Sequence, residues 1–265
     1  MHRAKKRFGQ NFLHDRNIIN RIVQSISPSA EDHLVEIGPG QGAITQELLK
    51  IAGKLEAVEL DRDLLQPLAE RCANLGRLQI YNSDALSFDF RQLVSEENPK
   101  PLRLVGNLPY NISTPLLFHL LEQADSIQDM HFMLQKEVVD RMAAKPGSKT
   151  YGRLSVMLQA WCKVEPLFDI GPGAFHPAPK VDSGFVRLTP YTTPLYHIKD
   201  QRLFSQIVTQ AFSQRRKTLR NSLKKMLDDT VFEQAGIDPS LRAERISLEE
   251  FVNLADKAWK TGQMS

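Results

Sequence analysis

The chain has 265 residues, of which 42% are hydrophobic and 25% are charged, and its formal net charge is +3. This composition is typical of a globular protein with a sizeable core, and the length suits one large and one small domain. It excludes a membrane-spanning protein, because no apolar run approaches the roughly 20 residues that cross a bilayer. The segment from Phe8 to Leu13 is too short and too polar for the core of a signal peptide, so we expect none.

Cysteine and histidine usage predicts neither a disulfide nor a metal site. Cys72 and Cys162 are the only cysteines, far apart and in apolar contexts, which favours a reducing cytoplasm. The seven histidines show no paired metal-ligand spacing, so no structural zinc or other metal is expected.

Short apolar runs alternate with helical patterns over the first 190 residues. Runs typical of strands occupy 34–37, 55–60, 78–81, 102–105, 130–134 and 184–188, and helical patterns lie near 41–51, 61–74, 114–123 and 136–144. This alternation predicts a mostly parallel sheet with helices on both faces, an α/β fold of the Rossmann-like class.

The pattern changes after the last predicted strand. Residues 189–200 contain two prolines and scattered threonines, which is typical of a linker. Apolar residues then keep helical spacing from Leu203 to Leu227, and Ser247, followed by two glutamates, opens a last helix that ends near Trp259. We therefore predict a large domain over residues 1–197 and a small all-α domain over residues 198–265.

Positive charge is clustered rather than spread evenly. Residues 1–7 carry four basic residues and no acid, and residues 211–225 carry six basic residues and no acid. Arg216, Arg220 and Lys224 recur every four residues, which places them in one stripe along a helix. Such clusters attract a polyanion, although a merely solvated helix face stays open as an alternative.

A glycine-rich loop follows the first predicted strand. Gly38, Gly40 and Gly42 alternate with other residues, so the backbone can approach a ligand closely. The spacing is neither the G-x-G-x-x-G of dinucleotide sites nor a phosphate-binding loop ending in Lys-Ser/Thr. A tight structural turn is the alternative.

Two acids follow the next two strands. Glu59 comes 21 residues after Gly38 (59 − 38), where an acid can accept both hydroxyls of a ribose. Asp84 follows the third strand, where its carboxylate can accept the amine of an adenine. Either residue alone could cap a helix. Together with the glycine loop, they indicate a nucleoside ligand without phosphates, and S-adenosylmethionine fits.

The segment Asn107-Leu108-Pro109-Tyr110 follows the fourth strand. The Asn107 side-chain oxygen can accept a hydrogen bond from an amine. Pro109 favours an extended Leu108, whose carbonyl can then be a second acceptor, and Tyr110 offers a ring face for stacking. This combination suits holding a flat, amine-bearing base while a group is transferred to its amine.

These motifs resemble the rRNA adenine N6-dimethyltransferases over nearly the whole chain. The similar segments are 6–13, 38–42, Glu59, Asp84, 107–112 and 175–183, and segment 214–223 resembles the small-subunit branch of the family. The resemblance implies an S-adenosylmethionine-dependent methyltransferase that dimethylates two adjacent adenines in a hairpin loop near the 3′ end of 16S rRNA. Its partner would be this RNA within the small ribosomal subunit or its precursor, and a monomer is the default.

The resemblance also implies roles for individual residues. Those expected around the cofactor are Asn11, Leu13, Gly38, Glu59, Asp84 and Asn107, with Gln10 helping to close over it. Asn107, Leu108 and Tyr110 would hold the target adenine, and Phe175 would cover its other face, unless Phe175 is a core aromatic. RNA phosphates would be bound by Arg215, Arg216, Arg220 and Lys224.

Other functions stay open at this stage. A relative acting on large-subunit rRNA and conferring antibiotic resistance is one, and segment 214–223 argues against it. DNA adenine methyltransferases usually carry Asp-Pro-Pro-Tyr where this chain has Asn107-Leu108. A mainly non-catalytic small-subunit assembly factor is the last alternative, which the intact cofactor and target motifs oppose.

Overall fold

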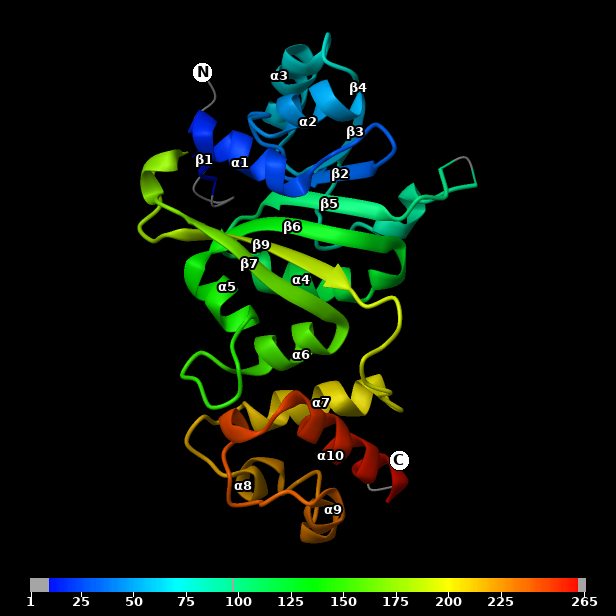
Figure 1. The fold of residues 1–265 in the computed structure, drawn as a ribbon, viewed down its shortest axis with the longest axis vertical. Coiled ribbons are helices and arrows are strands. Elements are labelled where there is room, and N and C mark those ends of the chain that lie inside the picture. The colour runs from blue at the N-terminus through cyan, green and yellow to red at the C-terminus, as the bar shows by residue number, and fades with distance from the viewer. Residues whose placement is uncertain (1–9, 97, 262–265) are drawn as a thin grey trace. The chain divides into compact units, whose positions relative to one another are not determined.

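The structure is a computed structural model that describes residues 10–96 and 98–261 (Figure 1). It divides into two compact units, Met1–Val139 with Glu165–Pro190, and Asp140–Val164 with Tyr191–Ser265. The predicted cationic cluster at residues 1–7 lies outside the described residues. Sequence reasoning places residues 140–164 in the first domain, whereas helix α6 (Arg153–Trp161) contacts α7 and α10 of the second unit. The division into domains 1–197 and 198–265 stays a prediction about independently folding parts.

A seven-stranded sheet runs through the described chain in the order β4–β3–β2–β5–β6–β9–β7. Strands β2 to β6 pair in parallel and β9 pairs antiparallel with β6. The bounds are β2 His33–Ile37, β3 Lys54–Glu59, β4 Arg77–Asn82, β5 Leu102–Asn107, β6 Ile127–Gln135, β7 Cys162–Ile170 and β9 Ser183–Pro190. The predicted mostly parallel sheet is confirmed.

Helices cover both faces of this sheet, as expected (Figure 1). On one face lie α1 (Arg16–Ile26), α2 (Thr45–Ala52) and α3 (Arg62–Cys72), and on the other lies α4 (Ser113–Leu121). Val105 and Met133 face the core beneath the first three helices. Because side chains alternate along a strand, Leu104 and Phe132 face the opposite layer. All four side chains are almost fully buried, so the sheet is a rigid platform for its loops.

The strand order creates a switch point between β2 and β5. The chain runs from β2 outward to β4 and then returns to the other side of β2 as β5. Connections therefore leave the carboxyl ends of β2 and β5 in opposite directions and open a crevice there, which is where open α/β sheets bind ligands.

Several elements are absent from the sequence prediction. Strand β7 contains Pro166, which argues against a central strand, and its position at the edge of the sheet tolerates a residue without an N–H. A two-stranded pair joins β1 (Phe12–Leu13) to β8 (Phe175–His176). The remaining bounds in the first three-quarters of the chain are α5 Lys136–Met142 and the 3₁₀ turns Phe90–Leu93, Ala124–Ser126 and Pro172–Ala174.

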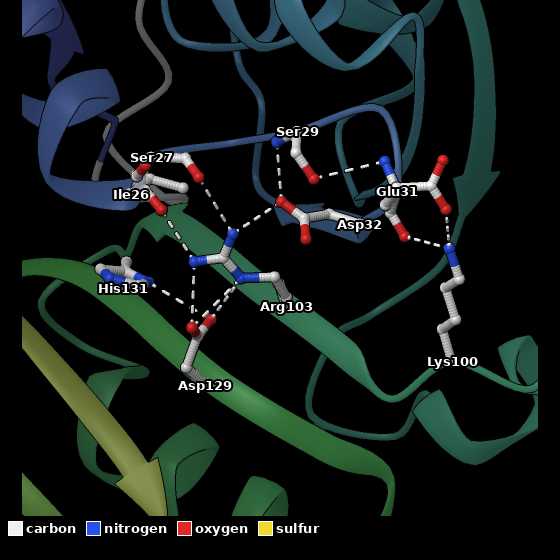
Figure 2. Close-up of polar contacts among 9 residues, drawn as sticks. All are labelled: Ile26, Ser27, Ser29, Glu31, Asp32, Lys100, Arg103, Asp129 and His131. Atoms are coloured by element: carbon white, nitrogen blue, oxygen red, sulfur yellow. Dashed lines mark hydrogen bonds and ion pairs between the residues drawn. The ribbon is translucent and has the colours of Figure 1, made fainter.

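A buried arginine ties the start of β5 to its surroundings, as Figure 2 shows. Arg103 is 8% exposed, and its Nε and Nη2 donate to Asp129 at 3.0–3.1 Å. Its Nη1 donates to Asp32 Oδ2 at 2.7 Å, and Nη2 donates to the Ile26 carbonyl at 2.7 Å. The Ile26 carbonyl is an otherwise unpaired group at the end of α1. One side chain thus joins α1, β5, β6 and the loop before β2.

The second unit is helical beyond the linker. Its helices there are α7 Gln201–Ala211, α8 Leu219–Leu223, α9 Asp229–Ala235 and α10 Leu248–Lys260, with a 3₁₀ turn at Ala243–Arg245. The predicted last helix is confirmed, and Ser247 and Glu250 form its capping box. None of the helices in the described ranges is both long and apolar enough to span a membrane.

The predicted continuous helix across Leu203–Leu227 is wrong. Helix α7 ends at Ala211, and α8 begins only at Leu219. Between them, Thr218 forms an isolated bridge with Arg242, and the Leu219 N–H donates to the Leu241 carbonyl. Backbone pairing to this distant segment replaces helical bonds, so the basic residues lie on a turn and a short helix rather than on one stripe.

Candidate active site

A cavity of about 330 Å³ opens at the carboxyl ends of β2, β3 and β5. Its lining includes most of the residues singled out from sequence, namely Asn11, Leu13, Gly38, Glu59, Asp84, Asn107, Leu108 and Tyr110. These residues are up to 99 positions apart (110 − 11). Most of them meet because they end or follow parallel strands of the sheet, whereas Asn11 and Leu13 come from the segment around β1. Phe175 is not among the lining residues.

The glycine loop has the backbone that only glycine adopts easily. Gly38, Gly40 and Gly42 have φ values of +67°, +58° and +82°. A Cβ on Gly42 would lie 2.6 Å from Leu68 Cδ1, and one on Gly40 would lie 3.2 Å from the Phe12 ring. The loop is therefore a tight turn that packs closely against Leu68 and Phe12 while it lines the cavity.

Glu59 is buried against this loop and is held by backbone N–H groups. Gly40 donates to Oε2 at 3.1 Å and Asp61 donates to Oε1 at 2.8 Å. Burial raises the pKa of the Glu59 carboxyl, and these two bonds partly oppose the rise. The cap of α3 is Asp61. Glu59 is therefore no helix cap, and backbone N–H groups fix its carboxylate at the wall of the cavity.

Asp84 is half-buried and serves a local turn as well as the cavity. Its Oδ1 accepts the Leu86 N–H at 2.9 Å, and its carbonyl accepts the Ser87 N–H at 3.1 Å. The capping alternative is thus partly right for Asp84. The turn fixes the orientation of a carboxylate that also lines the cavity.

Asn107 is the last residue of β5, and a hydrogen bond to the backbone of Asn11 orients its side-chain amide. Its Nδ2 donates to the Asn11 carbonyl at 2.8 Å, which leaves Oδ1 as the acceptor end. Gly106 precedes it because a Cβ there would lie 2.7 Å from the Ile37 carbonyl oxygen. Strands β2 and β5 therefore approach closely where Asn107 enters the cavity.

The next three residues turn the chain into α4. The Leu108 N–H donates to the Met133 carbonyl at 3.1 Å. The Pro109 carbonyl accepts the Ile112 N–H at 3.1 Å and the Ser113 hydroxyl at 2.9 Å. Tyr110 Oη and Ser183 Oγ share a hydrogen bond of 3.0 Å. The Leu108 carbonyl differs from that of Pro109. Among the loops, turns and caps of residues 10–96 and 98–261, no backbone N–H donates to it.

Residues 10–13 form a roof over the cavity. Gln10 Nε2 donates to Asp61 Oδ2 at 3.1 Å, and Phe12 packs on Gly40. The β1–β8 pair sets Leu13 opposite Phe175. Phe175 is only 3% exposed and belongs to the core beneath α1, so the structure favours the core alternative for its ring.

Sequence reasoning missed Glu36 as a residue of this site. Glu36 lines the cavity, is buried, and accepts a hydrogen bond of 2.6 Å from Thr45 Oγ1. Burial raises the pKa of its carboxyl to about 7, and the neighbouring Glu59 carboxylate adds to the rise. Glu36 lies two residues before Gly38, but an acid within strand β2 carries no signal of its own in the sequence.

The residues around the cavity fit an adenosine-type ligand without phosphates. Three carboxyl groups, those of Glu36, Glu59 and Asp84, line it together with Asn107. Carboxylates repel phosphates and favour cations, and S-adenosylmethionine carries a sulfonium and an ammonium group. The glycine backbone would admit such a ligand without steric conflict.

The predicted RNA-binding residues all lie in the second unit and are exposed. Arg215 Nη2 donates to the Lys149 carbonyl at 2.7 Å, and Arg220 pairs with Asp229 at 3.0 Å. No ion pair of Arg216 or Lys224 is found with residues 10–96 or 98–261. The structure thus keeps the four cations on one short segment, with Arg220 partly neutralised.

Comparison with known proteins identifies the family. The family model "Ribosomal RNA adenine dimethylase" matches residues 1–260. The chain is 58% identical to "Ribosomal RNA small subunit methyltransferase A" of Hahella chejuensis, covering 96% of this chain and 93% of that protein. It is 55% identical to the protein of the same name from Marinobacter nauticus, covering 99% and 94%.

Two solved structures share the fold over almost the whole chain. A dimethyladenosine transferase from Plasmodium falciparum has a TM-score of 0.81 at 25% identity, covering 95% of this chain and 98% of that one. The 23S rRNA methyltransferase ErmE has a TM-score of 0.71 at 25% identity, covering 93% and 99%. The chain belongs to the ribosomal RNA adenine dimethylase family, whose members are S-adenosylmethionine-dependent methyltransferases.

Proposed function

We propose that this protein transfers methyl groups from S-adenosylmethionine to the N6 amines of two adjacent adenines in the 3′-terminal hairpin loop of 16S rRNA. The observation that carries the proposal is the shared cavity, in which the Glu59 and Asp84 carboxylates meet the acceptors of Asn107 and Leu108. A relative 58% identical is named for the small ribosomal subunit, which supports this RNA as the substrate.

Cofactor binding falls to the glycine loop and the acids beside it. We assign the ribose hydroxyls to Glu59 and the adenine amine to Asp84, with Asn11, Leu13, Gly38 and Asn107 completing the lining. When bound, the cofactor supplies an electrophilic methyl group on sulfur. Residues 10–13 line the same cavity and would cover the bound cofactor.

The target amine is held by two acceptors. Asn107 Oδ1 and the Leu108 carbonyl accept its two N–H groups and aim the nitrogen lone pair at the methyl carbon. Glu59, Asp84 and the glycine loop would hold the cofactor, which would supply its methyl group to this lone pair, and the amine would give up one N6 proton in each transfer. Positioning of this kind lowers a barrier by several kcal/mol, and no strong general base is required.

The base itself must leave its stack to enter the site. Tyr110 offers one ring face at the cavity. We propose Phe175 for the other face, which requires its ring to turn out of the core when RNA binds, because it is buried in this structure.

RNA phosphates are assigned to the exposed cations of the second unit, Arg215, Arg216, Arg220 and Lys224. We further propose that the protein acts as a monomer in a reducing cytoplasm on the small subunit or its precursor. The buried, unpaired Cys72 and Cys162 support that compartment.

The test uses purified protein, labelled S-adenosylmethionine and small subunits from cells that lack the modification. We expect N6,N6-dimethyladenosine in the 3′-terminal hairpin after digestion, and none with Asn107→Ala. Label in large-subunit RNA or DNA instead would overturn the substrate assignment. Binding to small subunits without any label would favour the assembly-factor alternative.

A further inference from the structure

The side chain that holds the hydroxyl of Tyr110 lies 73 residues further along the sequence. Ser183 Oγ shares a 3.0 Å hydrogen bond with Tyr110 Oη. Ser183 is 2% exposed. A buried hydroxyl with one aromatic partner at the rim of the cavity is placed to control how that ring lies.

The position of Ser183 is set by the sheet rather than by a loop. It is the first residue of β9 and pairs with Gln135 at the end of β6. The residue before it is also held, because the Lys136 N–H donates to the Asp182 carbonyl at 2.9 Å. A Cβ on the following Gly184 would lie 3.0 Å from Val139 Cγ2, so the strand is tightly packed there.

Tyr110, by contrast, belongs to a short turn. It lies between Pro109 and the start of α4, and it is half-buried. Fixing the phenol oxygen fixes the direction of the axis from Cβ to Oη and so restricts χ1, because Cβ, the ring axis and Oη lie on one line. The rigid strand therefore sets where the ring of Tyr110 lies at the cavity.

We propose that Ser183 is a positioning residue that acts on the second methyl transfer more than on the first. The inference rests on the proposed function. An unmodified adenine offers two N–H groups to Asn107 and Leu108, whereas N6-methyladenosine offers one. With one hydrogen bond fewer, alignment of the second transfer depends more on the ring face of Tyr110, which Ser183 holds in place.

The test measures both products from the same reaction. Ser183→Ala, Tyr110→Phe and the double variant are incubated with unmodified small subunits, and N6-methyladenosine and N6,N6-dimethyladenosine are quantified over time. Loss of one hydrogen bond should raise the ratio of monomethyl to dimethyl product by roughly 3- to 10-fold. The double variant should match the single variants, because each removes the same bond.

A buried serine elsewhere is the matched control. Ser155 of the second unit is fully buried, and its Oγ donates to the Arg141 carbonyl and accepts the Gly152 N–H, so Ser155→Ala loses at least as much hydrogen bonding without touching Tyr110. Its product ratio should equal that of the unmodified protein. An unchanged ratio in Ser183→Ala and Tyr110→Phe, or an equal shift in Ser155→Ala, would overturn the inference.

The parent protein separates this inference from the proposed function. Dimethyladenosine formed by the parent, with no change of ratio in the variants, contradicts only the role of Ser183. Small-subunit RNA left unmodified by the parent contradicts the proposed function, and the role of Ser183 with it.

Discussion

The two ends of strand β5 differ in how their polar groups are used. At its start, Arg103 is buried and its donors are taken by Asp32, Asp129 and backbone carbonyls. At its end, Asn107 commits its amide hydrogen to the Asn11 carbonyl and keeps Oδ1 at the cavity. Saturated polar groups contribute rigidity, and unsaturated ones are available for a substrate. Strand β5 thus has a structural anchor at its start, Arg103, and a substrate-binding residue at its end, Asn107.

Removing the anchor should have the largest effect on stability. Arg103→Ala leaves the carboxylates of Asp129 and Asp32 without their cation, so the free energy of unfolding should fall by about 3–5 kcal/mol. Urea unfolding measures this loss. The control is Arg91→Ala, which breaks an exposed pair with Asp89 and should cost less than about 1 kcal/mol. Similar losses in the two variants would contradict the role of the anchor.

Removing the acceptor at the other end should affect catalysis instead. Asn107→Ala should lower kcat by about 100-fold or more, while stability changes by about 1 kcal/mol through the lost bond to Asn11. Methyl transfer under saturating cofactor and urea unfolding give the two quantities. The exposed Asn20 on α1 is the control, since Asn20→Ala should change neither. An Asn107→Ala protein that unfolds at much lower urea concentration but transfers methyl groups at the normal rate would contradict this assignment of roles.

Glu36 tests whether ionisation of a buried carboxyl group at the cavity lowers the free energy of unfolding. Because burial raises its pKa from 4.5 to about 7, its ionisation penalises the folded state increasingly as pH rises through this range. Glu36→Gln keeps an acceptor for Thr45, so its stability advantage should widen by about 2 kcal/mol between pH 5 and pH 8. Urea unfolding of both proteins at each pH measures the gap. Parallel pH curves would refute the shift.

The smallest expected effects concern RNA binding. Arg216→Ala with Lys224→Ala should lower the slope of log affinity against log salt by about 2, with cofactor binding intact. Arg220→Ala should lower it less, because Asp229 already pairs with this residue. Filter binding to small-subunit RNA over a salt series measures the slopes. Equal slopes for the double variant and the parent protein would exclude phosphate contacts.

The fold was predictable where each element carried its own pattern. The parallel strands, the glycine loop and the capped last helix depend on local chemistry, and the structure has them in place. Strand β7 was not predictable, because Pro166 is acceptable only at an edge that the sequence does not reveal. The break between α7 and α8 depends on pairing of Thr218 with Arg242, a contact between distant segments.

The site was predictable to the same extent. Residues at strand ends were found because parallel strands bring their carboxyl ends together. Glu36 was missed because an acid inside a buried strand looks like part of the strand, and only its bond to Thr45 and its place at the cavity distinguish it. Burial of Phe175 depends on the β1–β8 pair, which two residues on each side form without a sequence pattern.

That two-residue pair also bears on turnover. The roof over the cavity is held by β1–β8, by the bond from Gln10 to Asp61 and by the bond from Asn107 to Asn11. A short terminal segment of this kind opens at a lower cost than unfolding of the seven-stranded sheet. We therefore expect spent cofactor to be exchanged for fresh cofactor while the body of the enzyme stays folded, with opening of residues 10–13 limiting the number of methyl groups delivered per second.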